Sequence, residues 1–151
     1  MKTDVIAGLC AASLMLGAVA GPARATEEFA AEDQTPTRKY LTATEVRPIL
    51  ERTKRVWIGV REYEGQDWLY FTHLVDWRCG LHQLRYAIND GPLTVFPLTA
   101  CDPADPEAIP DDQGFSVTYA PGGIETVTID LLYDDLGTQT EVFTRADVLF
   151  E

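Results

Sequence analysis

Histidine, free cysteine and positive charge are all scarce in this chain of 151 residues. It has two histidines and three cysteines, and its 24 acidic side chains face only 12 basic ones. Two histidines without a free thiol argue against a zinc site. Such an acidic surface repels nucleic acid and anionic lipid, so we expect neither as a partner. We also expect no cofactor.

Catalytic and phosphate-binding motifs are missing too. There is no nucleophile elbow, and Gly122-Gly123 opens a predicted strand, not a helix whose N-terminus could hold a phosphate. Asp76 and Asp130 are the only carboxylates in mid-strand apolar surroundings, and nothing places them together as a glycosidase pair. These gaps favour a non-catalytic protein.

A membrane-spanning run is also lacking. Lys2 precedes a small and apolar run over residues 5–20, and the small-x-small site Ala23-Arg24-Ala25 follows. This layout predicts a signal peptide over residues 1–25, with Ala20 as a second possible cleavage point. A run of about 16 residues is shorter than the roughly 20 that span a bilayer, so we expect no stable membrane anchor. The mature protein is then periplasmic or secreted.

The mature chain has the size of one domain and an even number of cysteines. Without residues 1–25 it keeps 126 residues, with 10 basic and 23 acidic side chains. Cys10 leaves with the signal peptide, whereas Cys79 and Cys101 remain. Paired cysteines in an exported protein normally form a disulfide, so we predict a Cys79–Cys101 bond. The alternative is a nucleophilic Cys79 thiol near His82.

Hydrophobic periodicity divides the mature chain into a leader and a β-rich domain. Residues 26–41 are charged or small, which predicts a disordered or loosely attached leader. Residues 42–151 form the domain, and it begins with a helix over 44–55. After residue 55 the period changes to two, which indicates strands. The predicted strands are 55–63, 67–78, 81–89, 93–99, 115–120, 124–133 and 139–145.

Seven short strands with frequent tight turns predict a mainly β fold. We expect a single small antiparallel β-sandwich of immunoglobulin-like architecture, or a curved sheet, with one N-terminal helix packed on it. Residues 86–91 and 121–137 look like hairpin segments of immunoglobulin-like modules. Many unrelated functions share that architecture, so it indicates none.

The first predicted hairpin separates aliphatic from aromatic side chains. If Gly65-Gln66 form a two-residue loop, Val60 pairs with Phe71 on the core side. The opposite face then gathers Trp57, Arg61, Tyr63, Trp68 and Tyr70. Rings beside an arginine suit stacking on a sugar or anchoring a protein partner. The alternative is that the 44–55 helix covers these rings as core.

The other candidate groups have structural explanations. His73 falls on the core side of a predicted strand and Asp76 on the opposite side, so the two cannot form a dyad. His82 shares the parity of apolar neighbours and is also expected to be a buried histidine. The acidic side chains of the 102–112 loop could hold Ca²⁺ or attract a basic partner, but they lack the spacing of a calcium-binding loop, and a solvated loop is the favoured interpretation.

We therefore predict an exported, monomeric, non-catalytic binding module, such as an inhibitor or accessory of an envelope enzyme. Its binding residues would be Trp57, Arg61, Tyr63, Trp68 and Tyr70, with a protein or carbohydrate as partner. A small secreted hydrolase using a histidine–carboxylate pair is one alternative. A calcium-stabilised structural protein is the other.

Overall fold

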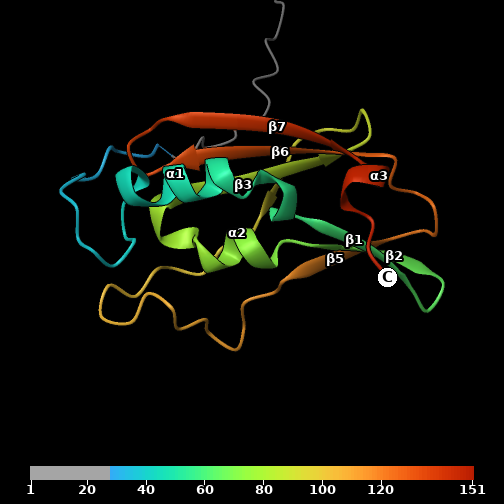
Figure 1. Cartoon of the computed structure of the whole chain (residues 1–151), viewed down its shortest axis with the longest axis horizontal. Coiled ribbons are helices and arrows are strands. Elements are labelled where there is room, and N and C mark those ends of the chain that lie inside the picture. Colours follow the sequence, from blue (N-terminus) through green and yellow to red (C-terminus); the bar gives the residue numbers. More distant parts are fainter. Residues whose placement is uncertain (1–27) are drawn as a thin grey trace, which may run out of the picture.

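Two antiparallel sheets dominate the computed structural model, which describes residues 28–151; the predicted signal peptide lies outside them. One sheet has the order β1-β2-β5 and the other β4-β3-β6-β7 (Figure 1). The mainly β prediction is confirmed. The strands are β1 Gly59–Tyr63, β2 Gln66–Tyr70, β3 Leu81–Ile88, β4 Thr94–Phe96, β5 Ser116–Tyr119, β6 Thr126–Tyr133 and β7 Thr138–Thr144. The helices are α1 Ala43–Arg52, α2 Thr72–Asp76 and α3 Arg145–Val148, with 3₁₀ turns at Lys54–Val56 and Arg78–Gly80.

Helix α1 is the N-terminal helix that the sequence predicts, with different ends. It begins one residue earlier than the predicted 44–55 span and ends at Arg52. Its first N–H, on Ala43, donates to the carboxylate of Asp134 at 2.8 Å, so a residue of the β6–β7 turn caps the helix. Val46 and Leu50 are fully buried. The helix is thus fixed by tertiary contacts at its start and along its apolar face.

Helix α2 replaces the second half of the predicted strand 67–78, which is therefore wrong beyond Tyr70. Phe71, Leu74 and Val75 are all buried, and their spacing of three and four places them on one side of a helix. A short apolar run fits helix and strand alike, so periodicity cannot decide between them. The start of the predicted strand 55–63 is also wrong, because β1 begins at Gly59.

The β1–β2 hairpin turns one residue earlier than predicted. Its loop is Glu64-Gly65, and both residues have positive φ (50° and 73°), as a type I′ turn requires. Val60 therefore pairs with Leu69 and not with Phe71, and Arg61 pairs with Trp68. Because the pairing shifts by two residues, each strand side chain keeps its predicted face.

One hydrophobic core joins both sheets and α1. It contains Val60 and Leu69 from the smaller sheet, Leu84 and Ile129 from the larger one, and Leu50 from α1. The predicted Cys79–Cys101 disulfide is present and ties the Arg78–Gly80 turn to the long loop between β4 and β5. Among residues 28–151, no helix is long and apolar enough to cross a membrane.

The described part of the predicted leader contacts the domain at several points. The N–H of Glu32 donates to the carbonyl of Asp134 at 2.8 Å. The amide of Gln34 donates to the Asp134 carboxylate at 2.8 Å. Phe29 stacks on His82 with 4.9 Å between ring centroids. Residues 28–34 thus lie along the end of the larger sheet.

Candidate functional site

The outer face of the three-stranded sheet carries four of the five predicted binding residues. Arg61 and Tyr63 lie on β1 and are exposed, Tyr63 by 48%. Trp68 and Tyr70 lie on β2 and are half-buried, with 6.3 Å between their ring centroids. The guanidinium of Arg61 sits 5.3 Å from the centre of the Tyr63 ring, a cation–π contact. We call these four residues the aromatic face.

Trp57 does not belong to the aromatic face, so its predicted place there is wrong. It is fully buried, and its indole N–H donates to the carbonyl of Leu50 at 2.8 Å. The prediction assumed that residues 55–63 form one strand with alternating side chains. A 3₁₀ turn at Lys54–Val56 replaces the start of that strand, and the Trp57 ring points inward. Trp57 therefore completes the core beneath α1.

Helix α1 does not cover the aromatic face, contrary to the second reading of the sequence. In Figure 1, α1 lies in front of the larger sheet, whereas β1, β2 and β5 extend to the lower right. The neighbour of the rings is instead the C-terminus. Phe150 lies 5.9 Å from Tyr70 between ring centroids, and its N–H donates to the carbonyl of Val60 at 2.9 Å. Phe150 is itself 47% exposed, so it extends the apolar surface.

A buried ion pair holds the hairpin that carries the aromatic face. Asp67 on β2 is fully buried, and Arg145 at the start of α3 donates to both of its carboxylate oxygens, at 2.7 and 3.0 Å. The N–H of Ile124 adds a bond of 3.2 Å. The hydrogen bonds from Arg145 hold the pKa of Asp67 below its usual range. The hairpin is therefore fixed before any partner arrives.

His73 and Asp76 lie three residues apart on α2, so the strand-based prediction that they face opposite ways is wrong. The Nε2 of His73 lies 2.8 Å from the hydroxyl oxygen of Thr53. That hydroxyl also lies 2.8 Å from the carbonyl of Ile49, to which it donates. His73 then donates to Thr53 and does not act as its base. Burial lowers the pKa of His73 and raises that of Asp76, but no hydrogen bond joins these two described residues.

His82 is half-buried between the leader and the larger sheet. One ring nitrogen lies 2.8 Å from the carbonyl of Ala30, and the other lies 3.7 Å from a carboxylate oxygen of Glu32. With Phe29 stacked on its ring, His82 joins the leader to the domain. The sequence predicts a buried histidine here, whereas the ring is half-buried and its polar partners come from the leader and not from the core.

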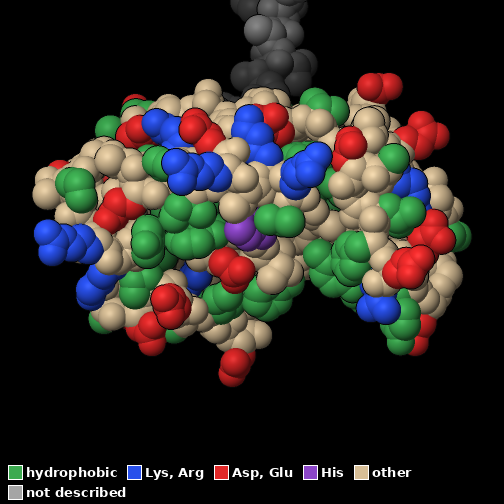
Figure 2. All heavy atoms as spheres, viewed as in Figure 1, with side chains coloured by type: hydrophobic (Ala, Val, Ile, Leu, Met, Phe, Trp, Pro, Cys, Tyr) green, Lys and Arg blue, Asp and Glu red, His purple; other side chains and the backbone are tan. Residues whose placement is uncertain are grey.

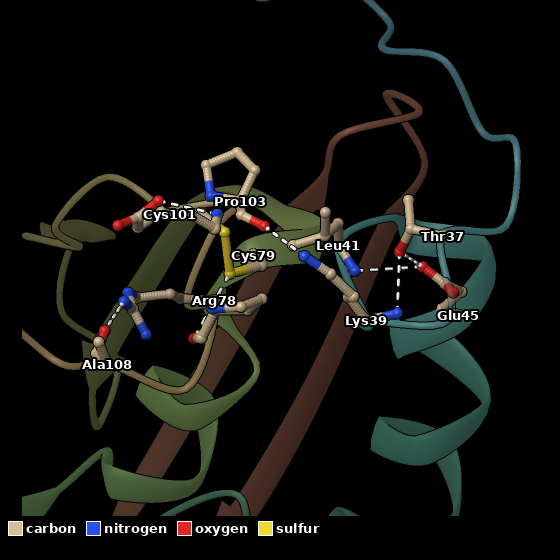
Figure 3. The surroundings of a disulfide bond; sticks show 12 residues. Thr37, Lys39, Leu41, Glu45, Arg78, Cys79, Cys101, Pro103 and Ala108 are labelled. Carbon is tan, nitrogen blue, oxygen red and sulfur yellow. Dashed lines mark hydrogen bonds between the residues drawn. A yellow bond between two sulfur atoms is a disulfide. The ribbon is translucent and has the colours of Figure 1, made fainter.

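Two buried polar residues with no recognisable sequence signal order the long acidic loop. Gln113 accepts from the N–H of Thr99 at 2.7 Å and donates to the carbonyl of Pro97 at 3.1 Å. Arg78 is 2% exposed and donates to the carbonyl of Ala108 at 2.6 Å (Figure 3). A lone glutamine in a polar loop gives no sequence signal of burial. Within residues 28–151, no three potential ligands among His, Cys, Asp and Glu are grouped to hold a metal ion.

Hydrophobic side chains also gather at the surface. Figure 2 shows one group at the left, in the region of α1 and α2, and another at the right, in the region of β1 and β2, with charged side chains around both. No protein-family model matches the chain, and no curated protein and no solved structure matches it either.

Proposed function

We propose that this protein is an exported binding module that engages a basic protein partner through the aromatic face. What supports this function above all is that tyrosine, tryptophan and arginine side chains are presented together on an uncovered sheet. These residue types dominate the energetics of protein interfaces. An envelope enzyme that the module inhibits or assists is the partner class that fits an exported chain.

The half-burial of Trp68 favours a protein partner over a carbohydrate. Its indole nitrogen is inaccessible and has no hydrogen-bond partner among the described residues. A sugar platform needs an open ring face with its polar edge free to bond hydroxyls. Here Tyr63 and Arg61 are exposed at the rim, and the half-exposed Phe150 lies beside Tyr70. A rigid surface of this kind suits insertion into a pocket of another protein.

The net negative charge of this chain favours a partner of net positive charge. The mature chain would carry about 13 more acidic than basic side chains. A basic protein would be steered toward this acidic chain as a whole, and its association rate would fall as the ionic strength rises. The predicted signal peptide would put the encounter outside the cytoplasm, and the Cys79–Cys101 disulfide is of the kind that persists there.

The proposed module has an immunoglobulin-like sandwich as its scaffold. Support comes from the shared core, in which side chains of both sheets and of α1 pack together. In such an arrangement one sheet face remains free while its other face is buried. The alternation along β1 and β2 follows this rule, since Val60 and Leu69 are buried and Arg61 is exposed.

Photocrosslinking in the native secretory compartment tests the function. A benzophenone amino acid at position 63 should give one dominant crosslinked protein of basic pI. The same group at Val142, which is 65% exposed on β7, should not yield that product. The double variant Arg61→Ala/Tyr63→Ala should lose at least about tenfold in affinity for the captured protein. Equal crosslinking at both positions, or unchanged affinity, would refute the proposal.

A further inference from the structure

A cavity beside the disulfide is a second candidate binding site, at the end of the molecule away from the β1–β2 turn. It has a volume of about 460 Å³, within the usual range of small-molecule sites. Three segments line it: residues 38–40; residues 76, 77 and 79; and residues 105–107. In Figure 1 the loop containing residues 38–40 lies at the left, whereas the β1–β2 turn lies at the right. We call this cavity the Trp77 pocket.

Two aromatic rings form a corner of the Trp77 pocket. Tyr40 and Trp77 meet edge to face, with 5.4 Å between centroids and 84° between ring planes. Tyr40 is 50% exposed, so its ring adds little to the core. In this geometry the edge of one ring meets the face of the other, and both residues line the pocket. Aromatic rings are favourable contacts for an organic cation.

The loop that carries Tyr40 is held in a costly conformation. Arg38 and Tyr40 both have left-handed backbone angles, with φ of 64° and 59°. Glu45 on α1 stabilises the loop by accepting hydrogen bonds from the N–H groups of Arg38 and Leu41 and from the hydroxyl of Thr37. Strain that the rest of the fold maintains around an exposed ring is typical of a preorganised site.

The charges around the pocket favour a positive ligand. Asp76, Asp105 and Glu107 line it, and burial raises the pKa of Asp76. Lys39 also lines it, but its ammonium donates to the carbonyl of Pro103 at 3.3 Å, as Figure 3 shows. That carbonyl is neutral, so Lys39 keeps its charge and the lining carries two cations, Arg38 and Lys39, against three carboxylates.

We propose that the Trp77 pocket binds an organic ammonium group, carried by a small free amine or by a lysine side chain of a polypeptide. The ring faces of Tyr40 and Trp77 contact the cation and its aliphatic stem. The carboxylates of Asp76, Asp105 and Glu107 neutralise its charge. The site does not depend on the aromatic face, so either function can fail alone.

Titration of the mature protein by ¹H–¹⁵N NMR tests this site. The probes are n-butylammonium and lysine blocked at its α-amino and carboxyl groups, which leaves the side-chain ammonium free. The neutral control is norleucine with the same blocking groups. We expect both amines to shift the Trp77 indole signal saturably, while the Trp57 and Trp68 signals stay in place. Tighter binding of the blocked lysine would identify a polypeptide as the source, and tighter binding of butylammonium a free amine.

Variants of the charged lining residues should change the affinity for amines in opposite directions. Asp76→Asn and Asp105→Asn should each weaken amine binding by about threefold, whereas Arg38→Gln should strengthen it. Asp111→Asn is the matched control, since Asp111 belongs to the same loop and does not line the pocket. Tyr40→Phe should keep the affinity and Tyr40→Ala should lose about fivefold.

Three results would overturn the proposal. One is no saturable shift of the Trp77 signal with either amine. Another is norleucine binding as well as lysine, because the pocket would then be only apolar. The third is an unchanged affinity in both aspartate variants while each variant retains the wild-type NMR spectrum outside the pocket.

Discussion

Asp67 is the residue on which the aromatic face depends most directly. Its carboxylate joins β2 to α3 through Arg145, and it joins β2 to the segment just before β6 through the N–H of Ile124. Asp67→Asn would leave Arg145 without its buried counter-charge, and we expect unfolding stability to fall by about 3 kcal/mol. Urea denaturation measures this loss.

The matched control for that variant is Glu62→Gln. Glu62 also bonds Arg145, but its side chain is 64% exposed. Removing a solvent-screened charge should change stability by less than about 0.5 kcal/mol. A loss in Glu62→Gln equal to that in Asp67→Asn would show that burial of the pair is unimportant.

The same pair predicts a pH dependence. The pKa of Asp67 is lowered in the folded protein, chiefly by hydrogen bonds from Arg145. Its contribution to stability is therefore full above the ordinary aspartate pKa of about 3.9 and is lost as the pH falls below that value. Wild-type protein should lose stability over this acid range more steeply than Asp67→Asn. Parallel acid limbs for the two proteins would contradict the assignment.

Asp134 is a second residue whose contacts reach far along the chain, because it caps α1 from the β6–β7 turn. It is almost fully buried and bonds both Ala43 and Gln34. Asp134→Ala should lower stability by about 1–2 kcal/mol, measured by thermal or urea unfolding. Asp134→Asn should lose less, because its amide oxygen can still accept from Ala43. An Asn variant as damaged as the Ala variant would mean that charge, and not capping, is what matters.

At the scale of elements, the C-terminal segment approaches β1 most closely at Gly59. A Cβ placed at Gly59 would lie 2.6 Å from the Phe150 ring, so any larger residue must displace that ring. Gly59→Ala should therefore speed amide exchange at Phe150, whose N–H bonds Val60. Hydrogen exchange measured by NMR reports the change.

A double-mutant cycle isolates that contact. Phe150→Ala removes the ring, so adding Gly59→Ala to it should cost almost nothing further. Additive losses from the two substitutions would place the effect of Gly59→Ala elsewhere, in the strand and not in its contact with Phe150.

Prediction of the elements succeeded where the chain is long and strictly periodic. All seven strands exist, and β3, β6 and β7 lie within one or two residues of their predicted ends. It failed at residues 71–78, where Phe71 and Val75 lie four residues apart, a spacing that fits one face of a strand and one face of a helix alike. The prediction also failed at Trp57. It assumed that the alternation of inward and outward side chains in β1 extends back to this residue, whereas a 3₁₀ turn at Lys54–Val56 precedes it. The predicted hairpin register was wrong because Glu64 adopts a left-handed backbone conformation, which its residue type does not indicate.

At the scale of the molecule, the disulfide closes the long loop onto the body of the fold. Cys79 and Cys101 are 22 residues apart, and their bond lies between the Trp77 pocket and the start of the loop. Replacing both with serine should lower stability by about 3 kcal/mol, because the unfolded chain gains freedom. Denaturant unfolding of the oxidised protein and of the double variant measures the difference. A loss well below 1 kcal/mol would mean that Arg78 and Gln113 alone hold the loop.

The sequence by itself determined the features that depend on neighbouring residues. Alternation fixed the seven strands and the two sides of the first hairpin, and cysteine parity predicted the disulfide. Tertiary structure decided which segments meet, because contacts between residues far apart in the chain leave no local period. It buried Trp57, left the aromatic face open with Phe150 beside it, and brought residues 38–40, residues 76, 77 and 79, and residues 105–107 together around the Trp77 pocket.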